Sequence, residues 1–332
     1  MLTLFQQTLK AQIKRQGPLP LSEVMDLSNA YYYAHQKVFG AHGDFITSPE
    51  ISQIFGEVVA FWLLNHTLPE NILAPTIVEL GPGRGILARD MMGIFSNVTN
   101  FTPRFYFLEQ SEPLRRVQQE TLAPYAFEKQ WIQCLSTLPK GPTFFIANEF
   151  FDALPIQQTI DALEIHVDFK DAFVFSPEHF ESQEIIESSP TRLAFAQYIA
   201  AHLKDNKGAG LIIDYGDYTE ERRNGDTLQA ILNHSYVHPL DHLGEADLTA
   251  HVDFKALSDV FLSFKLAVNF MTQAAFLNAY GFKERLSKRL TRSKTPQERN
   301  DQNARAQRLT DAHQMGHLFK VLEVLTPKEF EK

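Results

Sequence analysis

The pattern of apolar and polar positions changes period repeatedly along the chain. Short runs of β-branched and aromatic residues, typical of buried strands, alternate with stretches in which apolar residues recur at helical spacing. The strand candidates are residues 76–80, 104–109, 131–135, 143–148 and 210–215, with 318–325 as a last strand. Helical stretches separate most of them, at 86–95, 113–122 and 192–203. This alternation predicts a parallel sheet covered on both faces, a doubly wound (Rossmann-like) α/β fold.

Other segments depart from this alternation. Residues 1–40 have helical spacing, interrupted by a Gly-Pro break, and 51–64 is a strongly apolar helix for which Ser48 is the expected N-cap. After the fourth strand, short runs typical of antiparallel strands predict a β insertion. The expected organisation is an N-terminal helical or lid region at 1–70, a core at 71–216 and 315–327 that contains the insertion at 156–190, and a mainly helical substrate or partner extension at 217–314.

Composition narrows the classes of function. The 332 residues carry a formal net charge of −9, which argues against a nucleic-acid surface because phosphate binding needs clustered Lys and Arg. Basic residues do cluster at 283–308, but acids interrupt them, and we interpret this stretch as a solvated helical segment. No apolar run is long enough for a membrane span. The single cysteine, Cys134, excludes an internal disulfide and fits a reducing cytoplasm, where we expect the protein.

The sequence VELGPGRG at residues 78–85 is the clearest candidate for ligand binding. It joins a predicted strand to a predicted helix, where glycines let the backbone approach a ligand and the helix N-terminus offers N–H groups. Gly81, Gly83 and Gly85 are spaced G-x-G-x-G, and no Lys-Ser/Thr pair follows, so the loop is not a P-loop. The acid Glu79 suits a cationic ligand better than a pyrophosphate, and S-adenosylmethionine (SAM) is such a ligand.

A second acid supports this cofactor. Glu109 ends the predicted second strand, where a carboxylate can accept hydrogen bonds from both hydroxyls of a ribose. Together with the glycine loop it favours SAM, and NAD is the alternative, disfavoured by the glycine spacing.

The segment NEFFDALP at residues 148–155 follows the predicted fourth strand, whose carboxyl end faces the reactive part of a cofactor in such sheets. Asn148, Glu149 and Asp152 are the candidate catalytic residues. Two carboxylates can clamp a guanidinium and take up its proton, which a methyl-accepting arginine requires. The alternative is structural, with Asp152 capping a turn and the two phenylalanines in the core.

Two further polar segments have both a functional and a structural interpretation. In GDFITSPEISQ (43–53), Thr47 and Ser48 are candidate cofactor contacts in a lid, or simply helix-capping residues. In GEADLTAHVDF (244–254), His251 lies between acids, which suggests a metal site or a proton relay. We favour a polar loop in which Asp253 caps the next helix, and we predict no metal.

The chain resembles the MidA family of class I SAM-dependent methyltransferases over residues 17–325. The resemblance is carried by the four motifs quoted above together with IDYG (213–216) and MGHLFKVL (315–322). The resemblance implies a Rossmann-like methyltransferase core with N- and C-terminal extensions. It also implies that mitochondrial members assist assembly of respiratory complex I by symmetric dimethylation of an arginine. It assigns Glu79, the three glycines and Glu109 to the cofactor, and residues 148, 149 and 152 to the substrate.

We therefore expect a SAM-dependent methyltransferase that acts on an arginine of a protein partner, with no nucleic-acid partner. Two alternatives are a SAM-binding assembly protein without turnover and a small-molecule methyltransferase. The sequence does not name the acceptor, and it leaves open whether the β insertion forms a homodimer surface or a lid.

Overall fold

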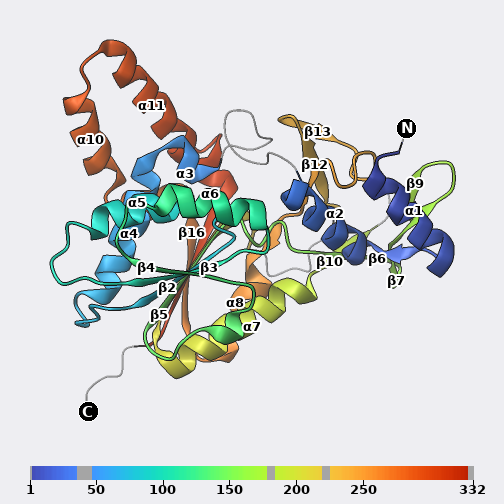
Figure 1. Cartoon of the computed structure of the whole chain (residues 1–332), viewed down its shortest axis with the longest axis horizontal. Coiled ribbons are helices and arrows are strands. Elements are labelled where there is room, and N and C mark those ends of the chain that lie inside the picture. Colours follow the sequence, from blue (N-terminus) through green and yellow to red (C-terminus); the bar gives the residue numbers. More distant parts are fainter. Residues whose placement is uncertain (1, 36–46, 178–183, 219–224, 328–332) are drawn as a thin grey trace. The chain divides into compact units, whose positions relative to one another are not determined.

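A computed structural model describes residues 2–35, 47–177, 184–218 and 225–327 (Figure 1). The chain divides into two compact units. The sheet unit comprises Ile46–Phe150, Gln197–Gly216 and Ser258–Lys332, and the insertion unit comprises Met1–Phe45, Phe151–Ala196 and Asp217–Leu257. The boundary at 216 coincides with the expected one, whereas no unit boundary lies at 70 or 314, and the expected division into functional regions stays a prediction.

The sheet unit is built on a central sheet in the order β16-β17-β11-β5-β2-β3-β4. Its strands are β2 (Thr76–Leu80), β3 (Arg104–Leu108), β4 (Glu128–Ile132), β5 (Thr143–Asn148), β11 (Gly208–Asp217), β16 (Ala267–Thr272) and β17 (Phe319–Leu325). Paired neighbours are parallel except β17, which runs antiparallel to both β11 and β16. The predicted doubly wound α/β fold is confirmed. The sequence analysis missed β16, whose alternating, half-exposed residues lack a continuous apolar run.

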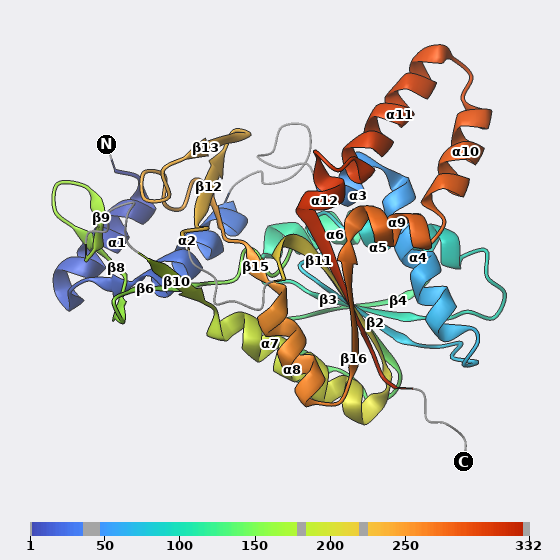
Figure 2. The same cartoon turned by 180° about the vertical axis from the view of Figure 1, so that it is seen from behind.

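Helices cover the sheet on both faces (Figures 1 and 2). Those that lie wholly in the sheet unit are α3 (Ser48–Ile51), α4 (Gln53–Thr67), α5 (Ile86–Phe95), α6 (Glu112–Leu122), α9 (Gln273–Ala279), α10 (Phe282–Arg292), α11 (Pro296–Thr310) and α12 (Met315–Leu318), with a 3₁₀ turn at Leu135–Thr137. The predicted single helix at 51–64 is two helices, because Ser52 is extended and its hydroxyl caps α4. The N-cap of α3 is Thr47 rather than Ser48.

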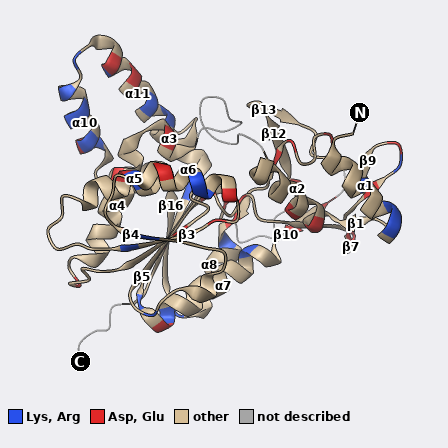
Figure 3. Ribbon diagram, viewed as in Figure 1, with Lys and Arg blue, Asp and Glu red and all other residues tan. Residues whose placement is uncertain are grey.

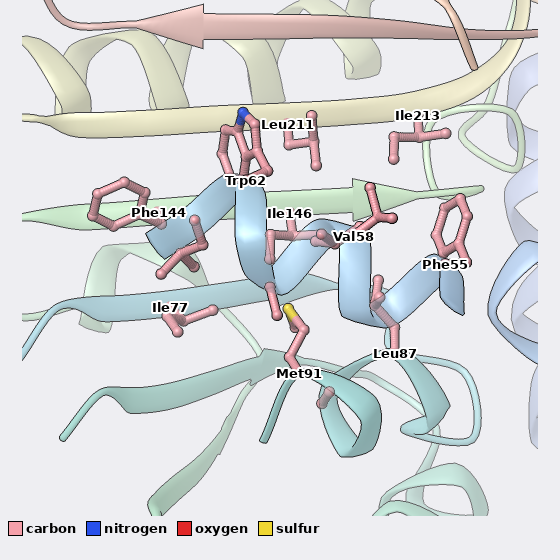
Figure 4. Close-up of a cluster of buried hydrophobic side chains, with 14 of the residues drawn as sticks. Phe55, Val58, Trp62, Ile77, Leu87, Met91, Phe144, Ile146, Leu211 and Ile213 are labelled. Carbon is pink, nitrogen blue, oxygen red and sulfur yellow. The ribbon is translucent and has the colours of Figure 1, made fainter. Parts of the chain in front are cut away.

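The core of the sheet unit lies between the sheet and α4 and α5 (Figure 4). Trp62 of α4 is fully buried, and its indole N–H donates to Glu323 of β17 at 2.8 Å. Successive residues of a strand point to opposite faces, so Ile77 and Glu79 of β2 share the face that α4 and α5 cover. The sequence thus places the carboxyl group of Glu79 in a mainly apolar layer, which also contains the buried carboxyl group of Glu323.

The insertion unit combines helices with small antiparallel sheets. Its elements are α1 (Leu4–Gln16), β1 (Leu19–Pro20), α2 (Leu21–His35), β6 (Gln157–Ile160), β7 (Leu163–Glu164), β8 (His166–Phe169), β9 (Phe173–Ser176), β10 (Ile185–Ser188), β12 (Gln229–Leu232), β13 (Ser235–Val237), β14 (Asp247–Thr249) and β15 (Val252–Asp253). Two helices, α7 (Pro190–Asn206) and α8 (Phe254–Ser263), begin in this unit and end in the sheet unit. The predicted β insertion is present, and α8 is the first helix among the described residues of the extension that was expected at 217–314.

Within the described ranges, no helix combines the length and the apolar character needed to cross a membrane.

Candidate functional site

The glycine loop between β2 and α5 has a backbone that other residues adopt poorly. Gly81, Gly83 and Gly85 have φ values of +62°, +52° and +76°. A Cβ on Gly81 would lie 2.9 Å from the ring of Phe150, which comes from the loop after β5. Gly85 is the N-cap of α5, so the first N–H groups of that helix are available at the loop. The sequence therefore builds a turn whose backbone can approach a ligand closely.

Glu79 lies one residue before the end of β2. Its side chain is 3% exposed, and among the described residues no group hydrogen-bonds its buried Oε2 atom. Burial raises the pKa of this carboxyl to about 8, because no compensating charge lies beside it. A buried acid of this kind fits a cationic ligand, whose arrival would favour the ionised form.

Glu109 follows β3 and is held by its neighbours. Its Oε1 accepts from the backbone N–H of Ser111 at 2.8 Å, and its Oε2 accepts from Nε2 of Gln118 at 3.0 Å. The Gln118 amide also donates to the Gly83 carbonyl at 2.7 Å, and it accepts from the Trp131 indole at 2.7 Å. Gln118 thus ties the glycine loop to Glu109, which places these two predicted cofactor elements together. Burial raises the pKa of Glu109, and these hydrogen bonds oppose the rise.

Glu149 follows β5 in an uncommon backbone conformation, with φ of +51°. Its N–H donates to the Ile213 carbonyl of β11 at 2.9 Å, and its Oε1 accepts from the Ser48 N–H and from the Asn148 amide, each at 3.1 Å. A non-glycine residue at positive φ costs about 1–2 kcal/mol, and these contacts offset that cost. The carboxylate is therefore fixed in position beyond the carboxyl end of β5.

The support for Glu149 continues behind Ser48. The fully buried Ser48 hydroxyl donates to Oε1 of Gln273 at 3.2 Å, and Nε2 of Gln273 donates to the Leu309 carbonyl of α11 at 2.9 Å. The structure thus places Ser48 next to Glu149, whereas Thr47 contributes the N-cap backbone of α3 and no side-chain cap bond. The preceding part of this motif, residues 43–46, lies outside the described residues.

Glu50 approaches the glycine loop from α3. Its Oε1 accepts from Nη1 of Arg84 at 3.4 Å, while no described group hydrogen-bonds its buried Oε2. Burial raises the pKa of Glu50, and Arg84 partly opposes the rise. The sequence analysis did not identify Gln118 or Gln273. Their role depends on which helix face is buried, and Gln118 is one of two buried residues on α6.

Asp152, the third predicted catalytic residue, belongs to the insertion unit. Its side chain is buried, and its carbonyl accepts from Nη2 of Arg192 and from the N–H of Ala250, each at 3.0 Å. Arg192 also donates to the carbonyls of Phe151 and His251, so one buried guanidinium joins the segments around 152 and 251. A role of Asp152 in catalysis stays a prediction.

The segment around His251 shows no metal-binding arrangement in the described part of the chain, where no group of three or more His, Cys, Asp and Glu could hold an ion. Asp253 caps α8 by accepting from the N–H of Ala256 at 2.9 Å. The structural interpretation of Asp253 is therefore confirmed.

The sheet unit as a whole offers groups that fit SAM. The buried carboxyl of Glu79 can meet a cationic part of the ligand, the Gly81 turn leaves no room for a side chain beside Phe150, and Glu109 presents oxygens suited to ribose hydroxyls. Asn148 ends the neighbouring strand β5 and Glu149 follows it, and the ring of Phe150 lies beside Gly81 of the loop. A ligand bound at the loop would therefore have a fixed carboxylate nearby.

Comparisons with known proteins agree with this geometry. Residues 57–270 match a family model described as "Putative S-adenosyl-L-methionine-dependent methyltransferase". A mitochondrial protein arginine methyltransferase of Xenopus tropicalis is 32% identical, over 95% of this chain and 84% of the relative. A human relative, also named a mitochondrial protein arginine methyltransferase, is 30% identical, over 96% of this chain and 82% of the relative.

Two solved structures from Burkholderia thailandensis share the fold. One, bound to S-adenosyl-homocysteine, superposes with a TM-score of 0.81 at 24% identity and covers 97% of this chain and 91% of its own. The other, a native structure, gives a TM-score of 0.78 at 23% identity with the same coverage. The likeness extends across both units of the chain.

Proposed function

The chain belongs to the MidA-like family of S-adenosyl-L-methionine-dependent methyltransferases, and we propose that it methylates an arginine side chain of a protein. The observation that carries the proposal is Glu149, a carboxylate fixed by Ser48 and Asn148 just beyond the carboxyl end of β5. The relatives at 30% identity or more are named protein arginine methyltransferases, which supports arginine as the acceptor.

The sheet unit supplies binding and orientation. The turn at Gly81–Gly85, the carboxyl of Glu79 and the oxygens of Glu109 would hold SAM, whose sulfonium makes its methyl group electrophilic. Because the reaction is an in-line displacement, the main task of the protein is to align the acceptor nitrogen with that methyl group.

Glu149 would perform this alignment. Its carboxylate can accept hydrogen bonds from a guanidinium and so orient one nitrogen toward the cofactor. A methylated guanidinium nitrogen must lose a proton, and a carboxylate within hydrogen-bond distance can receive it. Asn148 is positioned to hold the carboxylate, and its own buried Oδ1 has no hydrogen-bond partner among the described residues, so that atom can accept from the substrate. Asp152, the cytoplasmic location and a homodimer stay predictions from the sequence.

The proposal is tested by incubating the protein with SAM that carries an isotopically labelled methyl group and a proteome from cells that lack the protein. Mass spectrometry then identifies the labelled residues. We expect labelled methyl-arginine in a small set of proteins, and none with Glu149→Gln.

Two other outcomes would contradict the proposal. SAM binding without any labelled protein or metabolite would favour an assembly protein without turnover. Label that appears only in the small-molecule fraction would favour a small-molecule methyltransferase.

A further inference from the structure

Helices α10 and α11 of the sheet unit form a hairpin with a charge opposite to that of the rest of the chain. Residues 282–310 contain nine Lys and Arg against three Asp and Glu, a net of +6. Since the whole chain carries −9, the remainder carries −15. Both views show the hairpin extending away from the sheet of its own unit (Figures 1 and 2). Figure 3 shows basic residues along α10 and toward the base of α11.

Hydrophobic packing holds only the base of this hairpin. Phe282 at the start of α10 and Ala306 and Leu309 in the last turns of α11 are buried in the core of the sheet unit, and Leu286 packs against them. The rest of α11 is polar and gains little from that core, which leaves its outer part available for contact with a partner.

The base of the hairpin is nevertheless held firmly to α4. Glu57 of α4 accepts a hydrogen bond from Arg289 and lies 4.0 Å from Arg285. The Arg285 guanidinium stacks over the ring of Phe61, 3.6 Å from its centroid. Such a cation–π contact adds to the ion pair. One acid and one aromatic ring thus contact two of the basic residues and fix the orientation of α10.

Other basic residues of the hairpin have no such partner. Lys288 and Arg292, one turn apart on α10, are exposed, and among the described residues no carboxylate lies within ion-pair distance of either. Both line an open cleft of about 470 Å³ between α10, α11 and the start of α4. Lys283 and Arg299 are likewise exposed and line a cleft on another side of the hairpin. Lys288 and Arg292, two exposed cations on a rigid support, form an anion-binding surface on the first side of the hairpin, although Glu298 of α11 also lines that cleft.

The base of this surface is connected to the candidate acceptor site. A chain of three hydrogen bonds runs from the carbonyl of Leu309, in the last turn of α11, through Gln273 and Ser48 to the carboxylate of Glu149. With 15 residues, α11 is roughly 22 Å long, a span that about seven residues of extended chain would cover. A polypeptide lying along the hairpin could therefore place another part of itself at Glu149.

From these observations we propose that the α10–α11 hairpin is a docking surface for an acidic segment of the protein that is methylated. This inference rests on the proposed function for its choice of partner. The acceptor arginine is cationic and meets the carboxylate of Glu149, whereas the acidic segment meets Lys288 and Arg292. A negatively charged body, at −15, would repel a nucleic acid or an anionic membrane that approached broadly, but a short acidic segment contacts only the hairpin.

The test measures binding of synthetic peptides to the full chain by fluorescence anisotropy. The probe carries one arginine and, seven to ten residues away, a run of glutamates; a matched peptide has glutamines instead. We expect the glutamate peptide to bind about tenfold more tightly than the glutamine peptide, with an affinity that falls as salt rises. The double variant Lys288→Glu with Arg292→Glu should bind the glutamate peptide about tenfold more weakly. The neutral double variant Lys288→Gln with Arg292→Gln should lose less affinity.

The matched control is Lys14→Glu with Arg15→Glu, which makes the same change in charge on exposed residues in the last turn of α1. It should change binding less than twofold. Unchanged SAM affinity in every variant shows that the chain is folded. The proposal would be overturned if the two peptides bound equally well, or if the control variant lost as much peptide binding as Lys288→Glu with Arg292→Glu. It would also be overturned if an oligonucleotide or phosphatidylglycerol vesicles bound more tightly than the glutamate peptide. Peptide binding without any protein methylation would instead contradict the proposed function alone.

Discussion

The proposed cofactor side and the proposed acceptor side of the sheet unit are built by different means. At Gly81–Gly85 the backbone itself forms the site, through three glycines at positive φ and the start of α5. At Glu149 the backbone is strained and a side chain forms the site. The Ser48 N–H and the Asn148 amide hold its carboxylate, and Gln273 supports Ser48 from behind. The first arrangement favours glycine, and the second can tolerate substitutions that keep its hydrogen bonds. The two sides should therefore fail separately and in different measurements.

The largest expected effect is on turnover, from the acceptor side. Glu149→Gln keeps the shape and an acceptor oxygen for the Ser48 N–H but removes the negative charge and the proton acceptor. General acid–base contributions of this kind are worth about 10²–10⁴-fold, so kcat should fall about a thousandfold. Steady-state kinetics with an identified acceptor measure this. Glu112→Gln, an exposed carboxylate on α6, is the control, and normal turnover by Glu149→Gln would refute the role of Glu149.

On the cofactor side, Gly81→Val should weaken SAM binding about a hundredfold. The substitution forces a branched side chain into positive φ and against Phe150, at a cost of roughly 2–4 kcal/mol. Isothermal titration calorimetry gives the affinity. Gly17→Ala is the matched control, because Gly17 also has positive φ, at +90°, but has no atom within 4 Å of the added Cβ. Normal SAM affinity in Gly81→Val would mean that the loop does not hold the cofactor.

The pH dependence of SAM binding tests Glu79 separately from the loop. The pKa of its buried carboxyl is about 8, so below that pH the carboxyl is protonated and must lose its proton before it can pair with a cation. The affinity for SAM should therefore rise with pH, by up to about tenfold per unit, and level off above pH 8. Glu79→Gln should lose this dependence. Identical pH profiles for the two proteins would show that Glu79 does not face the cofactor.

The smallest effect is expected at Ser48, which supports Glu149 on the acceptor side. Ser48→Ala removes the hydroxyl that donates to Gln273 but keeps the backbone N–H that donates to Glu149. A single hydrogen bond is worth about 0.5–1.5 kcal/mol, so kcat should fall roughly threefold to tenfold at constant SAM affinity. Ser136→Ala, a substitution of a serine in an exposed turn, should leave kcat unchanged. A thousandfold loss from Ser48→Ala would indicate that Ser48 contacts the reacting groups directly.

The same contrast explains what could be predicted from sequence. Glycine spacing and strand-end acids are local signals, so Gly81, Gly83, Gly85, Glu79 and Glu109 could be named, and β2 was predicted at its observed bounds. Gln118 and Gln273 could not, because each acts through residues distant in the chain. The strand β16 was missed because its exposed residues follow no buried-strand pattern, and the break at Ser52 was missed because both flanking helices are apolar.

The most direct test of the separation between the two sides is the affinity of Glu149→Gln for SAM, measured by calorimetry beside the wild-type chain and Gly81→Val. The account predicts that Glu149→Gln binds SAM within about twofold of wild type, because its carboxylate serves the acceptor and not the cofactor. A loss of SAM binding as large as that of Gly81→Val would contradict it and would assign Glu149 to the cofactor side.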